Sequence, residues 1–143
     1  MTGNADGLRT LEKYSRIPSS SIRYVPNADA DIVHSIQNGI LFLVAFWSGP
    51  ALTAFSKLTQ ILHEMNMDDL DVVAVDVDGS PDVYQLPEIR ALFGGVVTAP
   101  MGKGEVAFCR DGRVVQAAII SDSYDTNQYT VNAREFLKTQ IQK

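Results

Sequence analysis

The sequence predicts an α/β domain with a mixed central sheet and helices on both of its faces. Three observations support this prediction. Two largely apolar runs, Ile40–Phe46 and Asp71–Asp78, are typical of strands buried on both faces. Helical segments alternate with these strands, which favours parallel pairing through right-handed crossovers. Finally, Asp111-Gly112 separates two apolar runs near the end of the chain and predicts an antiparallel hairpin.

The first half of the domain is expected to hold two strands and two helices. Ser21–Val25 alternates in the manner of a strand. A short helix is expected over Ile32–Gln37, ended by Asn38-Gly39, because glycine tolerates the positive φ of a helix end. After the central strand, a long amphipathic helix begins at Pro50. Its apolar face consists of Leu52, Phe55, Leu58, Ile61, Leu62 and Met65.

The second half is expected to add a helical segment, the hairpin and a last helix. Val83–Phe93 is predicted to be helical but interrupted at Pro87, which lacks the N–H group that would continue the helix. Glu105–Cys109 and Arg113–Ile120 are the two strands of the hairpin. A polar stretch precedes the last amphipathic helix, Ala133–Ile141.

The chain is expected to be organised as one domain with a lead-in. Its 143 residues suffice for a single core. Residues 1–20 lack sustained periodicity, and we expect a flexible or loosely docked segment with a helical turn at Leu8–Tyr14. The compact domain is predicted to span residues 21–143.

Charge and composition disfavour several classes of partner. The net charge of −5 opposes binding to nucleic acid, which relies on clustered Lys and Arg. The longest apolar run, Ile40–Trp47, is too short to cross a bilayer, and the first residues do not resemble a secretory signal. We therefore expect a cytoplasmic protein that does not bind membranes. His34 and His63 lie on separate predicted helices and Cys109 is the single cysteine, so we expect no metal site and no cofactor.

Several segments, in this order, resemble the thioredoxin-like superfamily. LFLVAFWSGPA is similar to the strand and active-site loop of that family, and LDVVAVDVDGSP to the next strand and its turn. GVVTAP is similar to the segment that ends in the family's cis-proline, here Pro100, while VAFCRDGRVV and AREFLK resemble the terminal hairpin and helix. The resemblance covers about residues 21–143. It implies a three-layer α/β/α sandwich with a mixed central sheet, a C-terminal antiparallel hairpin and a final helix.

The 47–51 segment departs from the family where its chemistry resides. Thioredoxins usually carry Trp-Cys-Gly-Pro-Cys, and this chain has Trp47-Ser48-Gly49-Pro50-Ala51. The buried acid that assists proton transfer in the family is matched here by Ala45. Thiol–disulfide exchange needs an attacking thiolate and a resolving thiol, and a serine hydroxyl supplies neither. A structural role remains for Ser48 as the cap of the following helix and for Pro50 in its first turn.

The resemblance also implies a surface that holds extended peptides. The backbone of Ala99 would pair with a peptide in the manner of a strand, and Trp47 and Met101 would add apolar contacts. The alternative is that Trp47 is simply part of the core. The predicted partner-binding residues, called the candidate face below, are Trp47, Ser48, Gly49, Pro50, Ala51, Ala99, Pro100 and Met101.

These observations favour a redox-inactive binding module over an enzyme. Cysteine-free members of the superfamily include assembly chaperones for hydrogenase subunits, which implies an assembly or chaperone role. The partner would be a protein or client segment, or a second copy of this chain. The alternative is a thiol–disulfide or monothiol redox enzyme that uses Cys109, although a free cysteine on a strand is usually a small buried apolar group. A structural domain without a binding groove is a third interpretation.

Overall fold

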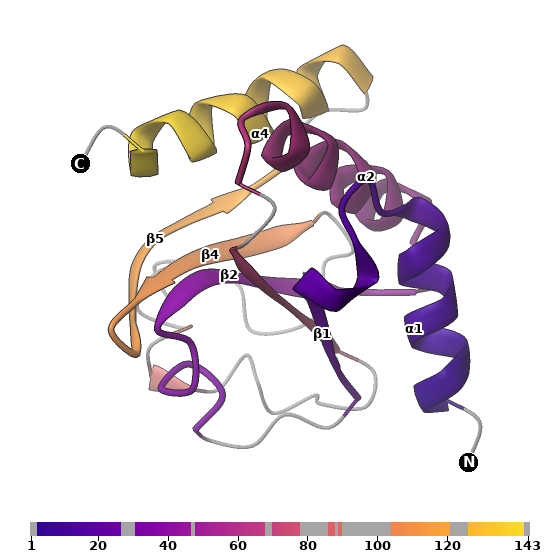
Figure 1. The fold of residues 1–143 in the computed structure, drawn as a ribbon, viewed down its shortest axis with the longest axis horizontal. Helices are drawn as coiled ribbons and strands as arrows, with labels where there is room; N and C mark the ends of the chain where they lie inside the picture. Colours follow the sequence, from indigo (N-terminus) through magenta and orange to yellow (C-terminus); the bar gives the residue numbers. More distant parts are fainter. Residues whose placement is uncertain are drawn as a thin grey trace.

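The computed structural model describes residues 3–26, 31–46, 48–67, 70–77, 86–87, 89, 104–120 and 126–141 (Figure 1). Within these residues the chain forms a five-stranded sheet flanked by helices. In chain order the elements are α1 (Gly3–Tyr14), the 3-10 turn η1 (Ser19–Ser21), β1 (Ile22–Val25), β2 (Asn38–Val44), α2 (Gly49–Glu64), β3 (Asp71–Asp76), β4 (Glu105–Arg110), β5 (Arg113–Ile119) and α4 (Thr126–Ile141).

The sheet is mixed, as the sequence predicts. Its strand order is β1-β3-β2-β4-β5. β3 lies between β1 and β2 and is parallel to both, whereas β4 is antiparallel to β2 and β5 is antiparallel to β4. Ile40 of β2 is opposite Val72 on one side and Phe108 on the other. The two continuously apolar runs therefore form the centre of the sheet, where both faces are buried.

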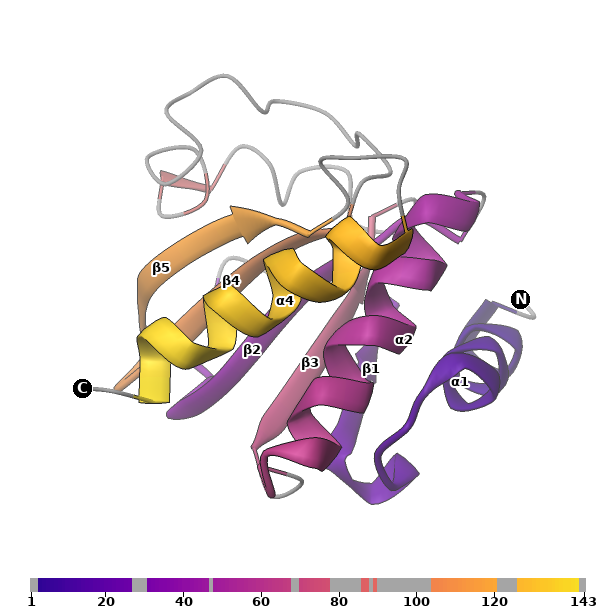
Figure 2. The ribbon, with the colours of Figure 1, turned by 90° about the horizontal axis from the view of Figure 1, so that it is seen from above.

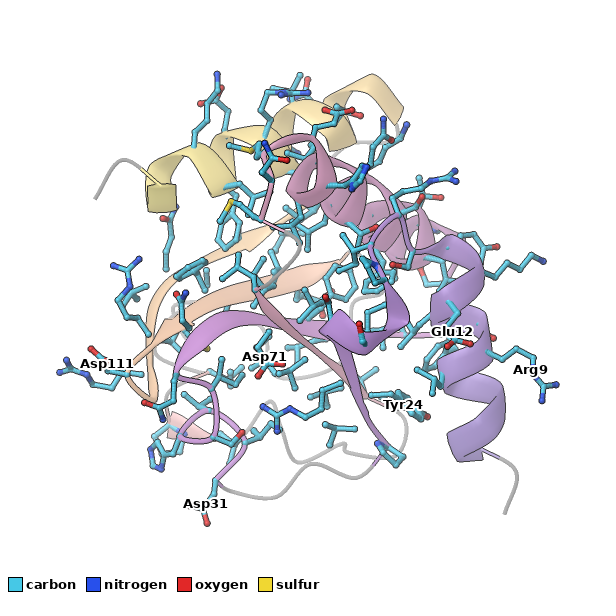
Figure 3. The ribbon with its side chains drawn as sticks, in the orientation of Figure 1. Arg9, Glu12, Tyr24, Asp31, Asp71 and Asp111 are labelled. Carbon is cyan, nitrogen blue, oxygen red and sulfur yellow. The ribbon has the colours of Figure 1, made fainter. Side chains whose placement is uncertain are left out.

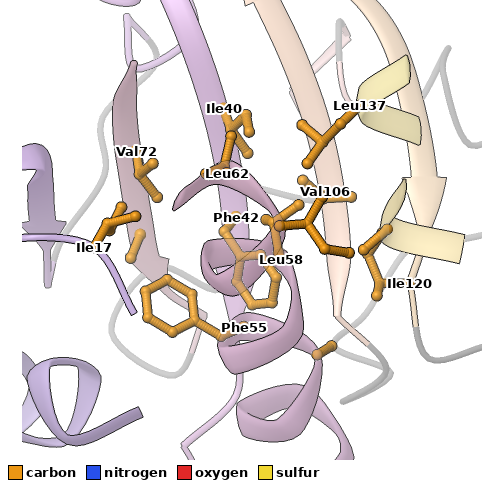
Figure 4. Close-up of a cluster of buried hydrophobic side chains, with 14 of the residues drawn as sticks. Ile17, Ile40, Phe42, Phe55, Leu58, Leu62, Val72, Val106, Ile120 and Leu137 are labelled. Atoms are coloured by element: carbon orange, nitrogen blue, oxygen red, sulfur yellow. The ribbon is translucent and has the colours of Figure 1, made fainter. Parts of the chain in front are cut away.

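Apolar clusters fill the space on both faces of the sheet. Helices α2 and α4 cover one face (Figure 2), and the cluster beneath them is called the α2 core (Figure 4). It contains Leu11, Ile17, Ile22, Ile40, Phe42, Val44, Leu52, Ala54, Phe55, Leu58, Ile61, Leu62, Leu70, Val72, Ala74, Val106, Phe108, Ile120, Ala133, Phe136 and Leu137. There the rings of Phe42 and Phe55 meet nearly perpendicularly, with centroids 5.3 Å apart. The far core lies on the opposite face. It contains Ile32, Val33, Ile36, Leu41, Leu43, Ala45, Val73, Val75, Val77, Ile89, Ala107 and Cys109.

The hairpin and the long helix after residue 48 agree with the predictions. Asp111 and Gly112 take positive φ values of 56° and 75°, as a two-residue hairpin turn requires. The turn is also joined to the residue before β2, because the N–H of Asp111 donates to the carbonyl of Gln37 at 2.8 Å. α2 runs to Glu64 with its predicted apolar face inward.

The short helix predicted over Ile32–Gln37 does not form. Residues 31–35 are turns, in which Ser35 Oγ donates to the carbonyl of Ile32 at 2.7 Å and so competes with helical hydrogen bonding. Asn38-Gly39 does not end a helix but lies within β2. A Cβ atom on Gly39 would overlap the backbone carbonyl of Asp71, so this glycine permits close approach between β2 and β3.

The two terminal helices are longer than the periodicity indicated. α1 begins at Gly3 rather than Leu8, and its Leu11 is fully buried in the α2 core. α4 begins at Thr126, ahead of the predicted Ala133. The prediction began too late because the first turns of this helix are polar and show no apolar face. Asn132 connects this part to the hairpin by donating from Nδ2 to the carbonyl of Ile120 at 2.8 Å.

Strand ends and one helical segment complete the comparison. β2 and β3 each end two residues before the predicted positions, at Val44 and Asp76. Most of Val83–Phe93 lies outside the described residues. Across the described part of the chain, no helix combines the length and hydrophobicity needed to cross a membrane.

Candidate functional site

The described part of the 47–51 segment is a capped helix start. Ser48 has extended backbone angles, and its Oγ accepts a hydrogen bond from the N–H of Ala51 at 3.3 Å. The Ser48 carbonyl accepts from Leu52 at 3.2 Å, and Pro50 occupies the first turn. Ser48 therefore performs the structural role expected of an N-cap, and proline suits the first turn because its missing N–H would have had no helical partner.

The side chains of this helix start differ in exposure. Ser48 is 6% exposed and Ala51 is fully buried. Gly49 is exposed, and a Cβ atom built there would meet nothing within 4 Å. Position 49 is thus the open position of the described helix start, and a side chain placed there projects into free space.

β4 enters the sheet directly beneath α2. Gly104, the residue before β4, has a φ of 73°, and a Cβ atom on it would stand 2.6 Å from the Cβ of Ala54 in α2. Its carbonyl accepts from the N–H of Ile120 at 3.1 Å. A side chain at position 104 would push against the second turn of α2, so glycine is required there by both backbone angle and space.

Half of the candidate face lies outside the described residues. These are Trp47, Ala99, Pro100 and Met101, and the predicted cis bond at Pro100 is among them. Ser48, Gly49, Pro50 and Ala51 are described, and they lie together at the helix start. The proposed convergence of the two halves therefore stays a prediction.

A cluster that the sequence analysis missed lies where the parallel strands end. The hydroxyl of Tyr24 on β1 donates to Asp76 Oδ2 at the end of β3, at 3.2 Å. The Tyr24 ring also meets Phe46, just beyond β2, edge to face with centroids 6.0 Å apart. Burial, followed by the charge and hydrogen bond of Asp76, raises the pKa of Tyr24 to about 12. That both residues lie near strand ends follows from the sequence, whereas their pairing depends on which strands are neighbours in the sheet.

A buried acidic side chain near this edge of the sheet belongs to β4. Ala45 is 1% exposed in the far core, so no acid occupies that position. Glu105, the first residue of β4, is also 1% exposed and lies opposite Leu43 of β2. From the sequence, Glu105 is only the first residue of a predicted strand, because alternation alone does not reveal that a terminal position is covered.

Cys109 lies far from the helix start. It is fully buried in the far core, opposite Gly39 at the beginning of β2, whereas Ser48 follows the end of β2. The five residue steps from Gly39 to Val44 correspond to about 17 Å. Burial raises the pKa of the Cys109 thiol to about 12. The Arg110 guanidinium lies 5.4 Å from the centroid of the Phe108 ring, which belongs to the α2 core.

The raised pKa of Cys109 predicts a loss of stability at high pH. Because the folded-state pKa is above the ordinary 9.0, the contribution of Cys109 to the free energy of unfolding is fully present below pH 9.0 and is lost as pH rises towards 12. Urea unfolding between pH 9 and 10, below the window in which Tyr24 contributes, should show this slope, and Cys109→Ala should flatten it. An unchanged slope in that variant, or rapid alkylation of the native thiol, would contradict the assignment.

The histidines show no metal-binding arrangement within the described residues. The exposed His34 has its Nδ1 3.7 Å from Asp31 Oδ1 in the 31–35 turn, and His63 lies in the last turn of α2. In that same part of the chain, no three His, Cys, Asp or Glu side chains are grouped so as to hold a metal ion.

Solved structures of two thioredoxins and one from a study of a peroxiredoxin are similar to this chain. This chain is similar to mitochondrial thioredoxin 3 from Saccharomyces cerevisiae over 86% of its own length and 95% of that chain (20% identity, TM-score 0.52). It is similar over the same shares of the two chains to a structure from work on the thiol resolving mechanism in yeast mitochondrial 1-Cys peroxiredoxin (18% identity, TM-score 0.53). Thioredoxin from Trypanosoma brucei brucei is similar over 78% of this chain and 81% of its own (17%, 0.50).

These similarities establish the fold and leave the activity open. No protein-family model matches the sequence, and no curated protein matches it. At identities of 17 to 20%, the solved structures show that the described residues adopt the thioredoxin-like fold predicted from the sequence. The 47–51 segment of this chain contains no cysteine.

Proposed function

We propose that this chain, a thioredoxin-like fold without the redox cysteines, is a protein-binding module of the assembly or chaperone type. It would hold an extended segment of a partner at the candidate face. The observation that carries the proposal is the state of the helix start: Ser48 Oγ accepts from the Ala51 N–H at 3.3 Å, so it caps α2. The position that holds the first cysteine of thioredoxins thus holds a capping hydroxyl here, and Gly49 beside it is exposed.

The position of the single thiol supports this proposal over the redox alternative. Dithiol exchange needs two thiols within bonding reach, and this chain has one. Cys109 is fully buried, has its pKa raised by burial, and lies at the other end of β2 from Ser48. A monothiol enzyme would require an exposed thiolate, which this environment opposes.

A photo-crosslinking experiment tests the proposed binding face. A benzoylphenylalanine side chain introduced at Gly49 would project into open space beside the helix start. The expected result is one dominant adduct, formed in cells of the source organism and competed away by excess unlabelled protein. An adduct of twice the chain's mass would identify the partner as a second copy.

A matched control uses the same side chain at Val131, which is 49% exposed on α4. If position 49 gives no more adduct than position 131, the proposed face is not a binding surface. Wild-type protein is assayed in parallel for insulin reduction with dithiothreitol. Turnover there would support the redox alternative, and its loss in Cys109→Ala would assign it to that thiol.

A further inference from the structure

α1 contains a glycine at its middle, where glycine normally weakens a helix. Gly7 is buried, and a Cβ atom there would overlap the Cζ and hydroxyl oxygen of Tyr24. The helix backbone therefore lies directly against the Tyr24 ring, beside α1 in Figure 3. A residue that lowers helix propensity yet permits this approach indicates that the contact itself matters to the fold.

Tyr24 connects α1 to the residue that precedes the 47–51 segment. Its ring meets Phe46 with centroids 6.0 Å apart and an interplanar angle of 77°. Its hydroxyl donates to Asp76 Oδ2 at 3.2 Å, which adds a polar contact with the end of β3. One tyrosine thus contacts the backbone of α1 on one side and the approach to the candidate face on the other.

Further contacts dock α1 and the chain that follows it. Leu11, one helical turn after Gly7, is fully buried in the α2 core. Beyond the helix, the N–H of Arg16 donates to Thr59 Oγ1 of α2 at 3.0 Å, and this threonine is fully buried. A helix of 12 residues is marginal in isolation, so α1 depends on these contacts for its order.

We propose that α1 is a clamp that holds the Tyr24 ring against Phe46, through the series of contacts Gly7, Tyr24 and Phe46. When α1 is docked, Tyr24 is enclosed between the helix backbone and the Phe46 ring. When α1 is released, Tyr24 loses one of the surfaces that hold it, and the position of Phe46 just beyond β2 changes. This proposal concerns the chain that leads into the helix start and holds whether or not a partner binds there.

Trp47 provides the measurement, because it is the single tryptophan of the chain and directly follows Phe46. Gly7→Val is expected to release α1, which limited proteolysis would detect as new cleavage within residues 1–14. The same variant should shift the Trp47 emission maximum and change its quenching by acrylamide. Glu12→Ala, an exposed change on the same helix, should leave protease protection and both fluorescence measurements as in the wild type.

A second pair of variants tests the connection without disturbing α1 directly. Tyr24→Phe keeps the ring between Gly7 and Phe46 and should preserve the Trp47 signal. Tyr24→Leu removes the ring contact and should shift that signal, even if Gly7→Val fails to fold. The proposal is overturned if α1 is released while Trp47 emission and quenching stay unchanged, or if Tyr24→Leu leaves them unchanged in a folded protein.

Discussion

Replacing Ser48 and Ala51 together by cysteine is expected to give a protein that forms an internal disulfide and reduces insulin. The capping contact brings the two positions near each other, because the Ser48 Oγ lies 3.3 Å from the amide nitrogen of Ala51. A thiol at position 48 would stand at the N-terminus of α2, where the helix dipole and free N–H groups favour the thiolate. Its pKa should therefore fall below that of an ordinary cysteine thiol.

The expected reaction balances with dithiothreitol as the reductant. The thiolate at position 48 attacks an insulin disulfide, and the thiol at position 51 resolves the mixed disulfide, releasing reduced insulin. Dithiothreitol then reduces the internal disulfide of the variant and is itself oxidised. The turbidity of reduced insulin measures turnover, while mass spectrometry after alkylation measures the internal disulfide.

Single replacements separate geometry from simple thiol addition. Ser48→Cys alone should form mixed disulfides without efficient turnover, because no resolving thiol is present. Losing the capping hydroxyl costs about 1 kcal/mol, so circular dichroism must first show that each variant is folded. A folded double variant with no internal disulfide would mean that the helix start no longer has the shape that dithiol chemistry requires.

The fold was predictable because its main signals are local in sequence. The apolar runs of β2 and β3, the period of α2 and the Asp111-Gly112 turn each specify one element, and their order specifies a mixed sheet. Ser48 was recognised as a cap for the same reason, since its partner is Ala51, three residues away. Local patterns failed at α4, whose first turns have no apolar stripe, and at 31–35, where a side chain competes with helical bonding.

The contacts around the site could not be predicted because they join residues distant in sequence. Tyr24 and Asp76 are 52 residues apart, and nothing near either one indicates the other. Gly7 resembles a helix breaker until the Tyr24 ring is placed against it. Gly104 resembles part of a loop, since the constraint comes from Ala54 on a helix earlier in the chain. Pairings of this kind require knowledge of which strands are neighbours.

Gly104→Ala is expected to lower the free energy of unfolding by about 2–4 kcal/mol, from positive φ and overpacking together. The backbone at position 104 has a φ of 73°, which residues with a Cβ atom rarely adopt. The added methyl would also stand 2.6 Å from the Cβ of Ala54, so α2 would have to move away from β4. Urea unfolding followed by circular dichroism measures the loss.

Two further variants assign that loss to the contact with α2. Gly49→Ala changes the glycine at the start of α2, where the added Cβ meets nothing within 4 Å, so stability should change little. Ala54→Gly combined with Gly104→Ala removes the steric overlap and leaves the backbone penalty. The double-mutant cycle should therefore give a favourable coupling of about 0.5–3 kcal/mol. Additive losses would show that α2 does not rest on Gly104, and that β4 does not determine the position of the capped helix start.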